Sequence, residues 1–572
     1  MIEEKLEVLV REALATLGVE AGPILIEYPA EPSHGDYATN AALTYAKSAK
    51  LSPRELAGNL VVEMLRVTPE DIITIEVAGP GFINFRLSHE YFSRALGEAL
   101  QLKEKWGRNE IGKGKKFIVE YTDPNPFKEF HIGHLMSNSI GEAISRVVEA
   151  SGAETKRACY QGDMGMHVAM AVWGMLWTPD EGNKAQLLDD SASLKDKIGF
   201  LAASYAFGAT AYNARPEEKK EIVDINKKIY ASTDEQISKL YFWGRKVSLE
   251  YFETIYKKLG TKFDYKFFES ETGVFGKKIV EDNIGKVFEK SEGAVVYKGD
   301  ESKGLHTRVF INSEGLPTYE AKELGLAKTK YNTYAYDTSI VITGNEVNAY
   351  FKVLLDAMAK VFPDLASKTI HISHGMLRLP TGKMSSRTGD VITAESLIAM
   401  VKEKAYEKIG KEAFDEETRD VVAEQVAIGA IKYSILRQAS GKDIIFDFDQ
   451  SLSFEGDSGP YLQYTHARTL SLLAKAGDKK ADALSTHSNT NALHKQILHF
   501  PEVVERASIE REPHYIATYL IELARDFNGF YGNTIVLDGS ADEAYKLALV
   551  QATSQTLKNG LHLLAIPTPE RM

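Results

Sequence analysis

The sequence feature that most constrains the fold is a strand–loop–helix–strand pattern between residues 117 and 160. Residues 117–121 read as a strand, a turn-rich Asp-Pro-Asn-Pro loop follows at 123–126, and a helical pattern covers 132–150 before Gly152. A further strand is expected at 155–160. This order opens a parallel nucleotide-binding sheet, so the pattern predicts an α/β domain with a Rossmann-like sheet.

A long insertion interrupts the predicted sheet. Residues 184–259 are mostly helical in pattern, and strand-like segments return at 295–297, 307–311 and 339–343. We therefore expect one parallel sheet split by a helical insert, within a catalytic domain that covers residues 106–400.

Two further domains are expected beside it, because 572 residues are too many for one hydrophobic core. Residues 1–105 contain an amphipathic helix at 2–17 and two alternating strands around Gly79-Pro80-Gly81, which predict an α+β module with a hairpin. Residues 401–572 carry apolar positions at helical spacing and predict an all-α bundle. Its helices are expected at 416–437, 459–476, 514–531 and 542–565.

Composition restricts the class of protein further. Cys159 is the only cysteine, which excludes an internal disulfide framework and a cysteine-rich zinc site. No apolar run is long enough to span a bilayer, and the charged N-terminus is unlike a secretory signal, so a cytoplasmic protein is expected. The net charge of −12 argues against a nucleic-acid partner at first, but phosphate binding needs only a local basic surface. Lysine pairs such as Lys277-Lys278 are candidates, and each is more often a solvated face.

The tetrapeptide His131-Ile132-Gly133-His134 lies where the first loop enters its helix. Unpaired backbone N–H groups and the helix dipole favour an anion at such a position. Two histidines three positions apart share a helix face and can both donate to phosphate oxygens, while Gly133 leaves room for a flat base. On its own, the tetrapeptide fits two exposed histidines at a helix start equally well.

A second candidate is the loop Lys383-Met384-Ser385-Ser386-Arg387, which has glycines on both sides. Two cations and two hydroxyls in a glycine-flanked loop suit a phosphate clamp, although an ordinary exposed loop would look the same. The first motif lies 252 positions upstream (383 minus 131), with the interrupted α/β pattern between the two. Each motif is weak evidence by itself, but the two occur together on either side of one interrupted α/β pattern.

Together and in this order, the motifs resemble the histidine–glycine–histidine and lysine–methionine–serine signatures of class I aminoacyl-tRNA synthetases. Residues 120–135 resemble the arginyl-tRNA synthetase version, with a proline–asparagine pair at Pro124-Asn125 and Lys128 three positions before the first histidine. The glycine–aspartate loop at 162–165, the helix around 318–325 and the ending at 566–572 are similar to the same family. The resemblance covers essentially the whole chain.

The resemblance implies a set of residues that act on ATP. The catalytic residues would be His131, His134, Lys128, Lys383 and Arg387. The residues that bind ATP would be His131, Gly133, His134, Met376, Lys383, Met384, Ser385 and Ser386. Many arginyl enzymes lack the first lysine of the loop motif and rely on the upstream one, whereas this chain has both Lys128 and Lys383.

Arginine recognition can also be argued from the residues. A guanidinium needs planar carboxylate partners, because a buried cation must be paired. Pro317 suits the first turn of a helix, which would place Tyr319 and Glu323 on one face. Without the resemblance, an amphipathic surface helix would be the preferred interpretation of this pair.

The resemblance implies that Tyr319 and Glu323 hold the guanidinium with help from Glu120, and that Asn125 binds the amino-acid backbone. The family more often has aspartate where Glu323 stands, and the extra methylene shifts the carboxylate. For the family's nearby glutamine, the counterpart here is Asn345 or Glu346.

Candidate tRNA-binding residues lie in both flanking domains. Tyr461, Tyr464 and Arg468 recur on one helical stripe and could stack unpaired anticodon bases, although such a stripe is more often core packing. The resemblance implies an anticodon-binding bundle here. Asp36 and Tyr37 belong to a segment similar to the N-terminal module with which this family reaches the tRNA elbow.

The implied activity is that of an arginine–tRNA ligase. It would use ATP, with Mg²⁺ carried by the nucleotide, to form arginyl-adenylate, and would transfer arginine to the 3′-terminal adenosine of tRNA(Arg). A monomer that requires tRNA for arginine activation and has no membrane partner is expected. Two alternatives are a small-molecule adenylyltransferase, which would be shorter and lack the flanking modules, and a non-enzymatic tRNA-binding relative, which would be expected to lose the histidines or the loop lysine.

Overall fold

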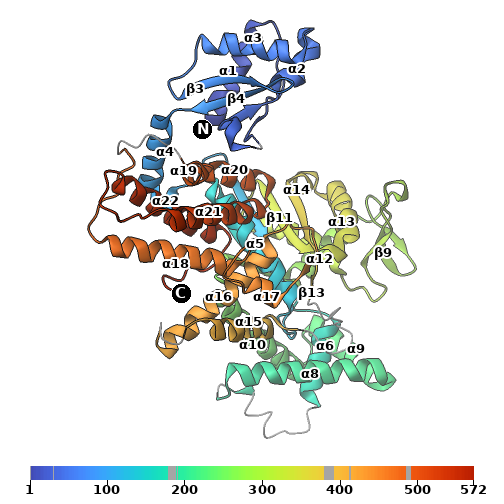
Figure 1. Cartoon of the computed structure of the whole chain (residues 1–572). Helices are drawn as coiled ribbons and strands as arrows, with labels where there is room; N and C mark the ends of the chain where they lie inside the picture. The colour runs from blue at the N-terminus through green and yellow to red at the C-terminus, as the bar shows by residue number, and fades with distance from the viewer. Residues whose placement is uncertain are drawn as a thin grey trace. The chain divides into compact units, whose positions relative to one another are not determined.

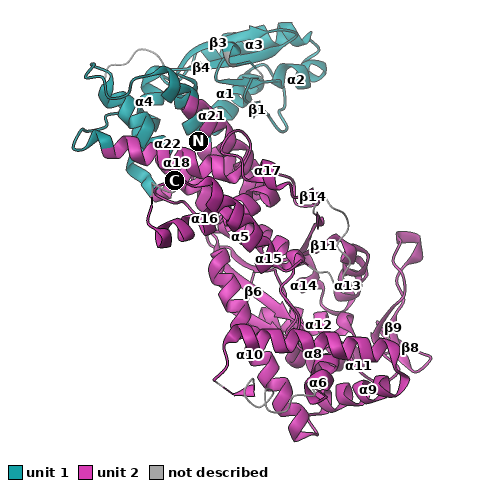
Figure 2. Cartoon of the chain, turned by 60° about the horizontal axis from the view of Figure 1, so that its bottom comes forward, with its two compact units in different colours: residues 1–103, 475–499, 529–553 teal, residues 104–474, 500–528, 554–572 magenta. Residues whose placement is uncertain are grey.

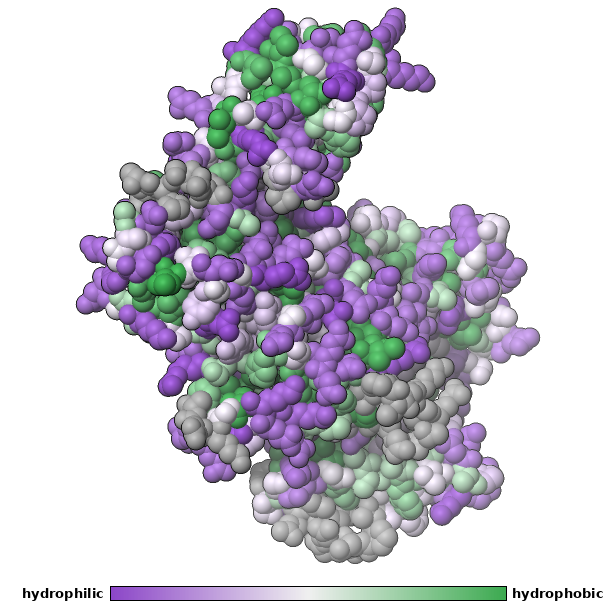
Figure 3. Space-filling view, viewed as in Figure 1, coloured by the Kyte–Doolittle hydropathy of each residue, from purple (hydrophilic) through white to green (hydrophobic). Residues whose placement is uncertain are grey.

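The computed structural model of the chain describes residues 2–29, 31–177, 188–189, 191–378, 392–410, 414–484 and 491–572. The chain divides into two compact units (Figure 2). Unit 1 consists of residues 1–103, 475–499 and 529–553, and unit 2 of residues 104–474, 500–528 and 554–572. No helix within the described ranges is both long and apolar enough to cross a bilayer. Hydrophilic residues cover most of the face in Figure 3, with hydrophobic residues in small groups between them.

Unit 1 contains a four-stranded antiparallel sheet in the order β1-β2-β4-β3 (Figure 1). Its strands are β1 (Ile26–Glu27), β2 (Tyr37–Thr39), β3 (Ile72–Ala78) and β4 (Phe82–Leu87). Its first helices are α1 (Ile2–Thr16), α2 (Ala41–Ala49), α3 (Pro53–Leu65) and α4 (His89–Leu102), with short 3₁₀ turns η1 (Pro32–His34) and η2 (Lys103–Lys105) near the element ends. The predicted hairpin is confirmed: β3 and β4 are joined through Gly79 and Gly81, whose φ angles of 49° and 141° suit glycine.

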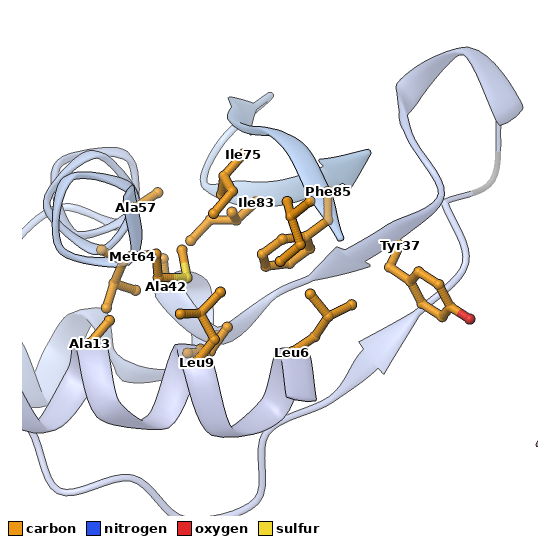
Figure 4. Packing of buried hydrophobic residues seen from close by; sticks show 14 of the residues in the cluster. Leu6, Leu9, Ala13, Tyr37, Ala42, Ala57, Met64, Ile75, Ile83 and Phe85 are labelled. Carbon is orange, nitrogen blue, oxygen red and sulfur yellow. The ribbon is translucent and has the colours of Figure 1, made fainter. Parts of the chain in front are cut away.

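The core of this sheet module forms because α1 keeps its apolar residues on one stripe. Leu6 and Leu9 of α1 are buried against Ile83 and Phe85 of β4, as Figure 4 shows. Removing these side chains from water is the main source of stability here. Tyr37 of β2 is also buried, with its hydroxyl pointing away from the labelled cluster (Figure 4).

Segments from late in the sequence complete unit 1. The short helix α19 (Ala492–Leu498) packs on α4. In α19, the buried His494 lies 2.9 Å from the carbonyl oxygen of Phe92 through Nε2 and 2.7 Å from the hydroxyl of Tyr545 through Nδ1. Residues more than 400 positions apart therefore share one hydrogen-bonded core.

Unit 2 contains the predicted parallel sheet. Its five strands have the order β12-β11-β5-β6-β7, and each neighbouring pair is parallel. They are β5 (Lys116–Glu120), β6 (Glu154–Gln161), β7 (Tyr265–Phe268), β11 (Thr338–Gly344) and β12 (Thr369–His374). The helix α5 (Ile132–Ala150) follows β5, as the sequence predicts. The strand order reverses between β5 and β11, and ligands of open parallel sheets bind beyond the carboxyl ends of the strands at such a point.

The helical insertion connects β6 to β7. Its helices within the described residues are α6 (Met166–Leu176), α8 (Leu194–Ala214), α9 (Pro216–Ala231) and α10 (Glu235–Leu259). These helices share an apolar core that includes Val172, Phe200 and Ile225. The predicted start of the insertion, at residue 184, lies outside the described residues.

The prediction that the strands after the insertion rejoin the parallel sheet is wrong for two of the three. β9 (Ala294–Tyr297) and β10 (Arg308–Ile311) pair antiparallel with each other and with β8 (Glu289–Ser291), in a separate sheet. Glu292 and Gly293 both have positive φ angles, so a tight turn pairs β8 with β9 locally. Of the three predicted strands, only the one at 339–343, which is β11, joins the parallel sheet.

Further helices lie between β7 and β12 in the sequence. They are α11 (Glu269–Asp282), η3 (Glu301–Lys303), α12 (Tyr319–Thr333), η4 (Asn345–Val347), α13 (Asn348–Val361) and α14 (Pro363–Lys368). The helix that carries Tyr319 and Glu323 starts at Tyr319, with Thr318 as its N-cap, and not at Pro317 as expected.

The C-terminal region is helical, as predicted. It contains α15 (Ala394–Lys408), α16 (Glu416–Leu436), α17 (Phe448–Ser451), α18 (Gly459–Ala476), α20 (Phe500–Glu510), α21 (His514–Asn533) and α22 (Glu543–Leu563). The four predicted helices are all present, with ends within about two residues of the predicted ones. A small parallel pair, β13 (Leu377–Arg378) and β14 (Ile444–Ile445), connects this region to the end of the parallel sheet.

Candidate functional site

The loop between β5 and α5 lies at the point where the strand order reverses, and hydrogen bonds fix it. Thr122, Asp123 and Phe127 have positive φ angles of 80°, 46° and 67°. Residues other than glycine adopt such angles only where their surroundings impose them. The backbone N–H of Thr122 donates to Ser137 Oγ at 3.0 Å, and that of Tyr160 donates to the Asp123 carboxylate at 2.7 Å. The loop is therefore preorganised before any ligand arrives.

The two histidines of the first motif lie together at the N-terminus of α5. His131 is the N-cap residue, and its Nδ1 accepts from Gly133 N at 3.1 Å. His134 Nδ1 accepts from His131 N at 3.2 Å. The two rings are stacked with centroids 3.6 Å apart. The prediction that both histidines share one face is confirmed.

Both imidazoles are held in the neutral form. Burial, with help from the nearby Lys128, lowers the pKa of His131 to about 4. Burial, His131 and Lys128 together lower the pKa of His134 well below its usual value. A neutral imidazole whose Nδ1 accepts a hydrogen bond carries its proton on Nε2. Each ring therefore has an Nε2–H donor that the helix cap does not use.

The chain that follows the second motif contacts the first. Ala394 N donates to Phe130 O at 2.8 Å, and Thr393 forms an antiparallel bridge with His131. The motif residues Lys383, Met384, Ser385, Ser386 and Arg387 lie outside the described residues. Met376, also predicted to bind ATP, is 40% exposed just before β13.

Two buried ion pairs lie near the carboxyl end of the sheet. Glu120, the last residue of β5, accepts from Lys330 Nζ at 2.6 Å, and both side chains are buried. Glu269, at the first position of α11, accepts from Lys322 Nζ at 2.5 Å. Each carboxylate thus has one lysine, which offsets part of the cost of burying its charge.

Glu323 of α12 differs from these two. Its side chain has no hydrogen bond or ion pair with any described residue. Burial raises its pKa well above the usual value, and Glu120, Asp123 and Glu269 raise it further, while Lys330 acts in the opposite direction. Glu323 is half-buried, and an unpaired carboxylate among other carboxylates favours a bound cation.

The other residues predicted to bind arginine are placed as follows. Asn125 lies in the β5–α5 loop so close to Gly162 that a Cβ on Gly162 would be 2.2 Å from Asn125 Oδ1, so any side chain at position 162 would displace the Asn125 amide. Tyr319 is 62% exposed at the first turn of α12. Asn345 and Glu346 are exposed in η4.

Sequence reasoning missed several residues of this region. Lys322, Lys330 and Glu269 were not singled out, although the position of Glu269 directly after a strand of the parallel sheet is a signal that could have been used. Asp163, in the glycine–aspartate loop, is fully buried, accepts a hydrogen bond from the Tyr241 hydroxyl at 2.9 Å, and forms an ion pair with Arg245 at 3.0 Å.

A cavity of about 1010 Å³ lies at the other end of α5. Arg146, Ala150, Leu259 and His562 are among its lining residues. The 19 residues of α5 separate its two ends by about 27 Å, at a rise of 1.5 Å per residue. The cavity is therefore distinct from the site at the histidines.

The residues predicted to bind tRNA make contacts within their own modules. In unit 2, Arg468 Nη2 donates to the Tyr464 hydroxyl at 3.2 Å, and Asn528 binds Arg468 and the Tyr461 hydroxyl. All three predicted residues are half-buried.

In unit 1, the carboxylate of Asp36 accepts from Leu87 N at 2.8 Å and pairs with Lys495 at 2.5 Å. The adjacent Tyr37 is buried. Contact of any of these residues with tRNA stays a prediction.

Comparisons with known proteins agree along the whole chain. A family model described as "tRNA synthetases class I (R), catalytic domain" matches residues 95–448. Models of the DALR anticodon binding domain and of the arginyl tRNA synthetase N-terminal domain match residues 462–572 and 4–87.

Curated relatives and solved structures extend this similarity. The arginine–tRNA ligase of Treponema denticola is 32% identical, over 96% of this chain and 95% of its own length. That of Halothermothrix orenii is 31% identical, over 100% and 99%. The Thermus thermophilus arginyl-tRNA synthetase structure superposes with a TM-score of 0.80 at 25% identity, covering both chains completely. The Plasmodium falciparum enzyme, at 20% identity and a TM-score of 0.79, shares the fold.

Proposed function

The chain belongs to the arginyl-tRNA synthetase family of class I aminoacyl-tRNA synthetases, and we propose that the carboxyl edge of its parallel sheet is where arginine is activated. Its activity is that of an arginine–tRNA ligase, which uses ATP. The observation that carries this proposal is the pair of stacked, neutral histidines at the N-terminus of α5, bridged to the chain that follows the second motif.

The histidine corner is proposed to bind ATP, which arrives as its Mg²⁺ complex. The N-terminus of α5 offers a positive dipole end, and the Nε2–H groups of His131 and His134 can donate to phosphate oxygens. Lys128, whose pKa is lowered by burial, adds a cation beside them. Gly133, also proposed to contact ATP, has no side chain, and a Cβ there would lie 2.9 Å from His131 Cε1, so the glycine leaves room for the His131 ring.

The loop motif and Met376 complete the proposed ATP site. Lys383 and Arg387 would stabilise negative charge that develops on the phosphates, and Met384, Ser385 and Ser386 would hold the nucleotide. The bond between Ala394 and Phe130 supports this assignment, because it keeps the end of the loop segment at the first motif.

The acidic side of the site is proposed to bind arginine. The unpaired carboxylate of Glu323 is the partner for the guanidinium, since a planar fork of N–H donors matches a carboxylate. Glu120, at the end of β5, adds negative charge. Tyr319 would cover the side chain, Asn125 would bind the α-amino and carboxyl end, and Asn345 would contribute from η4.

Activation and transfer follow from this arrangement. An oxygen of the arginine carboxylate attacks the α-phosphorus of ATP, the bond to the bridging oxygen breaks, and pyrophosphate leaves. The 2′-hydroxyl of the terminal adenosine of tRNA then attacks the carbonyl carbon of the adenylate, and AMP leaves. Positioning and charge stabilisation by fixed N–H donors and lysines supply the catalysis, so no side chain is required as a covalent nucleophile.

The flanking parts of the chain are proposed to bind tRNA. We divide the chain into an elbow-binding module at 1–105, a catalytic domain at 106–400 and an anticodon-binding domain at 401–572, and we assign tRNA contacts to Asp36, Tyr37, Tyr461, Tyr464 and Arg468. The family-model matches at both ends support this division. A cytoplasmic monomer is proposed on the sequence alone.

Aminoacylation of total tRNA with each radiolabelled amino acid in turn tests the proposal. Arginine alone should become attached, and a different amino acid, or none, would overturn it. Pyrophosphate exchange with and without tRNA then tests whether arginine activation requires tRNA.

A further inference from the structure

The hydroxyl of Tyr350, in the first turn of α13, is buried and has no hydrogen-bond partner among the described residues. Other buried tyrosine hydroxyls of unit 2 have partners: that of Tyr121 donates to Glu142 at 2.5 Å, and those of Tyr160 and Tyr241 bind Thr272 and Asp163. Burying a hydroxyl without a hydrogen bond costs free energy. The Tyr350 hydroxyl is therefore a feature that the ligand-free fold does not explain.

The surroundings of this hydroxyl indicate what could bind it. Tyr350 follows β11 and η4 at the carboxyl edge of the sheet, and α13 packs on α12. Burial raises the pKa of Tyr350 well above its usual value, and among charged groups Glu323 raises it most, followed by Glu320. The unpaired phenol of Tyr350 and the unpaired carboxylate of Glu323 therefore lie on two contacting helices, and the two groups are not hydrogen-bonded to each other.

A single ligand group can satisfy both residues. Glu323 offers only acceptors when ionised, and the phenol oxygen can accept as well as donate. A ligand between them must bring several N–H donors and a positive charge. A guanidinium has five N–H donors in a flat fork and no acceptor, whereas an ammonium is a compact point charge with three donors on one nitrogen.

We propose that Tyr350 is a specificity residue of this enzyme, whose hydroxyl oxygen accepts an N–H of the substrate guanidinium while Glu323 accepts others. The proposal rests on the assignment of the acidic side of the site to arginine. In this assignment Tyr350 supplies the tyrosine hydroxyl that contacts the guanidinium. Tyr319, which is largely exposed, then lies at the rim of the arginine site.

Tyr350→Phe tests this with the full-length enzyme and its tRNA. The KM for arginine should rise about 10- to 100-fold, the range for a hydrogen bond to a charged group, while the KM for ATP stays within about twofold. Inhibition by agmatine, which has the guanidinium but no carboxylate, should weaken by the same factor. The control is Tyr331→Phe, which removes the hydroxyl of a half-buried tyrosine on the neighbouring helix α12 and should change neither KM.

Thermal unfolding separates ligand binding from a structural role. Because the hydroxyl has no partner in the ligand-free fold, Tyr350→Phe should leave the Tm of the free protein unchanged or higher, and should reduce the rise in Tm caused by arginine with tRNA present. A lower Tm of the free protein would mean that the hydroxyl is bonded within the fold, which would overturn the inference.

Two further results would overturn it: an unchanged KM for arginine, or a raised KM with unchanged inhibition by agmatine, which would place the hydroxyl at the other end of the substrate. Failure of the unaltered enzyme to charge arginine would instead remove the proposed function itself. The two failures are therefore distinguishable.

Discussion

At the N-terminus of α5 the ionisable site residues are bases, whereas the site residues Glu120 of β5 and Glu323 of α12 are acids. Burial acts on both groups in the same chemical direction, toward the neutral form. It lowers the pKa of His131 and His134 and raises that of Glu323. The histidines can donate to phosphate while neutral, but Glu323 must lose its proton to pair with a guanidinium. The two sides of one site should therefore respond differently to pH and to substitution.

The largest effect is expected at the histidines. In His134→Asn the side chain can still accept from His131 N, but it has no donor at the position of Nε2. Loss of a preorganised donor to developing charge should lower kcat for pyrophosphate exchange about 10²- to 10³-fold. His134→Gln places an amide N–H near the Nε2 position and should recover part of the rate. Equal losses in both variants would show that the ring does not act through Nε2. His306→Asn, on an exposed histidine, is the control.

A smaller and more selective effect is expected at Glu323. Glu323→Gln removes the charge that pairs with the guanidinium and should raise the KM for arginine about 10- to 100-fold, with little change in the KM for ATP. Steady-state pyrophosphate exchange with each substrate varied measures both values. Equal increases in the two KM values would contradict the assignment of Glu323 to the guanidinium. Glu271→Gln, on the exposed face of α11, should leave both unchanged.

Substitution of Lys128 also tests the proposed ATP site at the histidines, and a smaller effect on activity is expected. Lys128 lies near the histidines without an ion-pair partner among the described residues, and its Nζ is 5.6 Å from the centroid of the Tyr205 ring. Lys128→Met should raise the KM for ATP about fivefold and leave that for arginine unchanged, because one partly exposed point charge is lost. Lys262→Met is the exposed control. A larger increase in the KM for arginine than in the KM for ATP would assign Lys128 to the arginine site instead.

The smallest effect is a difference in pH dependence. Since the pKa of Glu323 is raised in the free enzyme, arginine binding must release its proton, so arginine affinity should rise with pH and level off above that pKa. Burial lowers the pKa of His131 to about 4 and that of His134 well below its usual value, so the KM for ATP should be nearly constant between about pH 6 and pH 8. We expect the KM for arginine to fall as the pH rises, and Glu323→Gln to flatten the profile. Parallel profiles for both substrates would contradict the comparison.

Local patterns in the sequence were sufficient for much of this site. The helix at 132–150 has the predicted ends because a long apolar stripe and a following glycine mark it, and His131 and His134 are therefore placed correctly. The partners of the buried carboxylates were not predictable in this way. Lys330 lies 210 positions from Glu120, and Lys322 lies 53 positions from Glu269, so only the folded sheet brings each pair together. The strands β9 and β10 are a different case, because they pair with each other and β9 also pairs with β8 across the turn at Glu292-Gly293. Their strand pattern was recognised, but this local antiparallel pairing was not.

The composition of unit 1 has a consequence for the order in which the polypeptide can fold during synthesis. Its sheet is encoded before residue 90, yet α19 and the segment at 529–553 belong to the same unit. The ribosome must release most of the chain before His494 can reach Phe92 and Tyr545. We therefore expect the first hundred or so residues to become fully resistant to proteolysis only when translation of the chain is nearly finished.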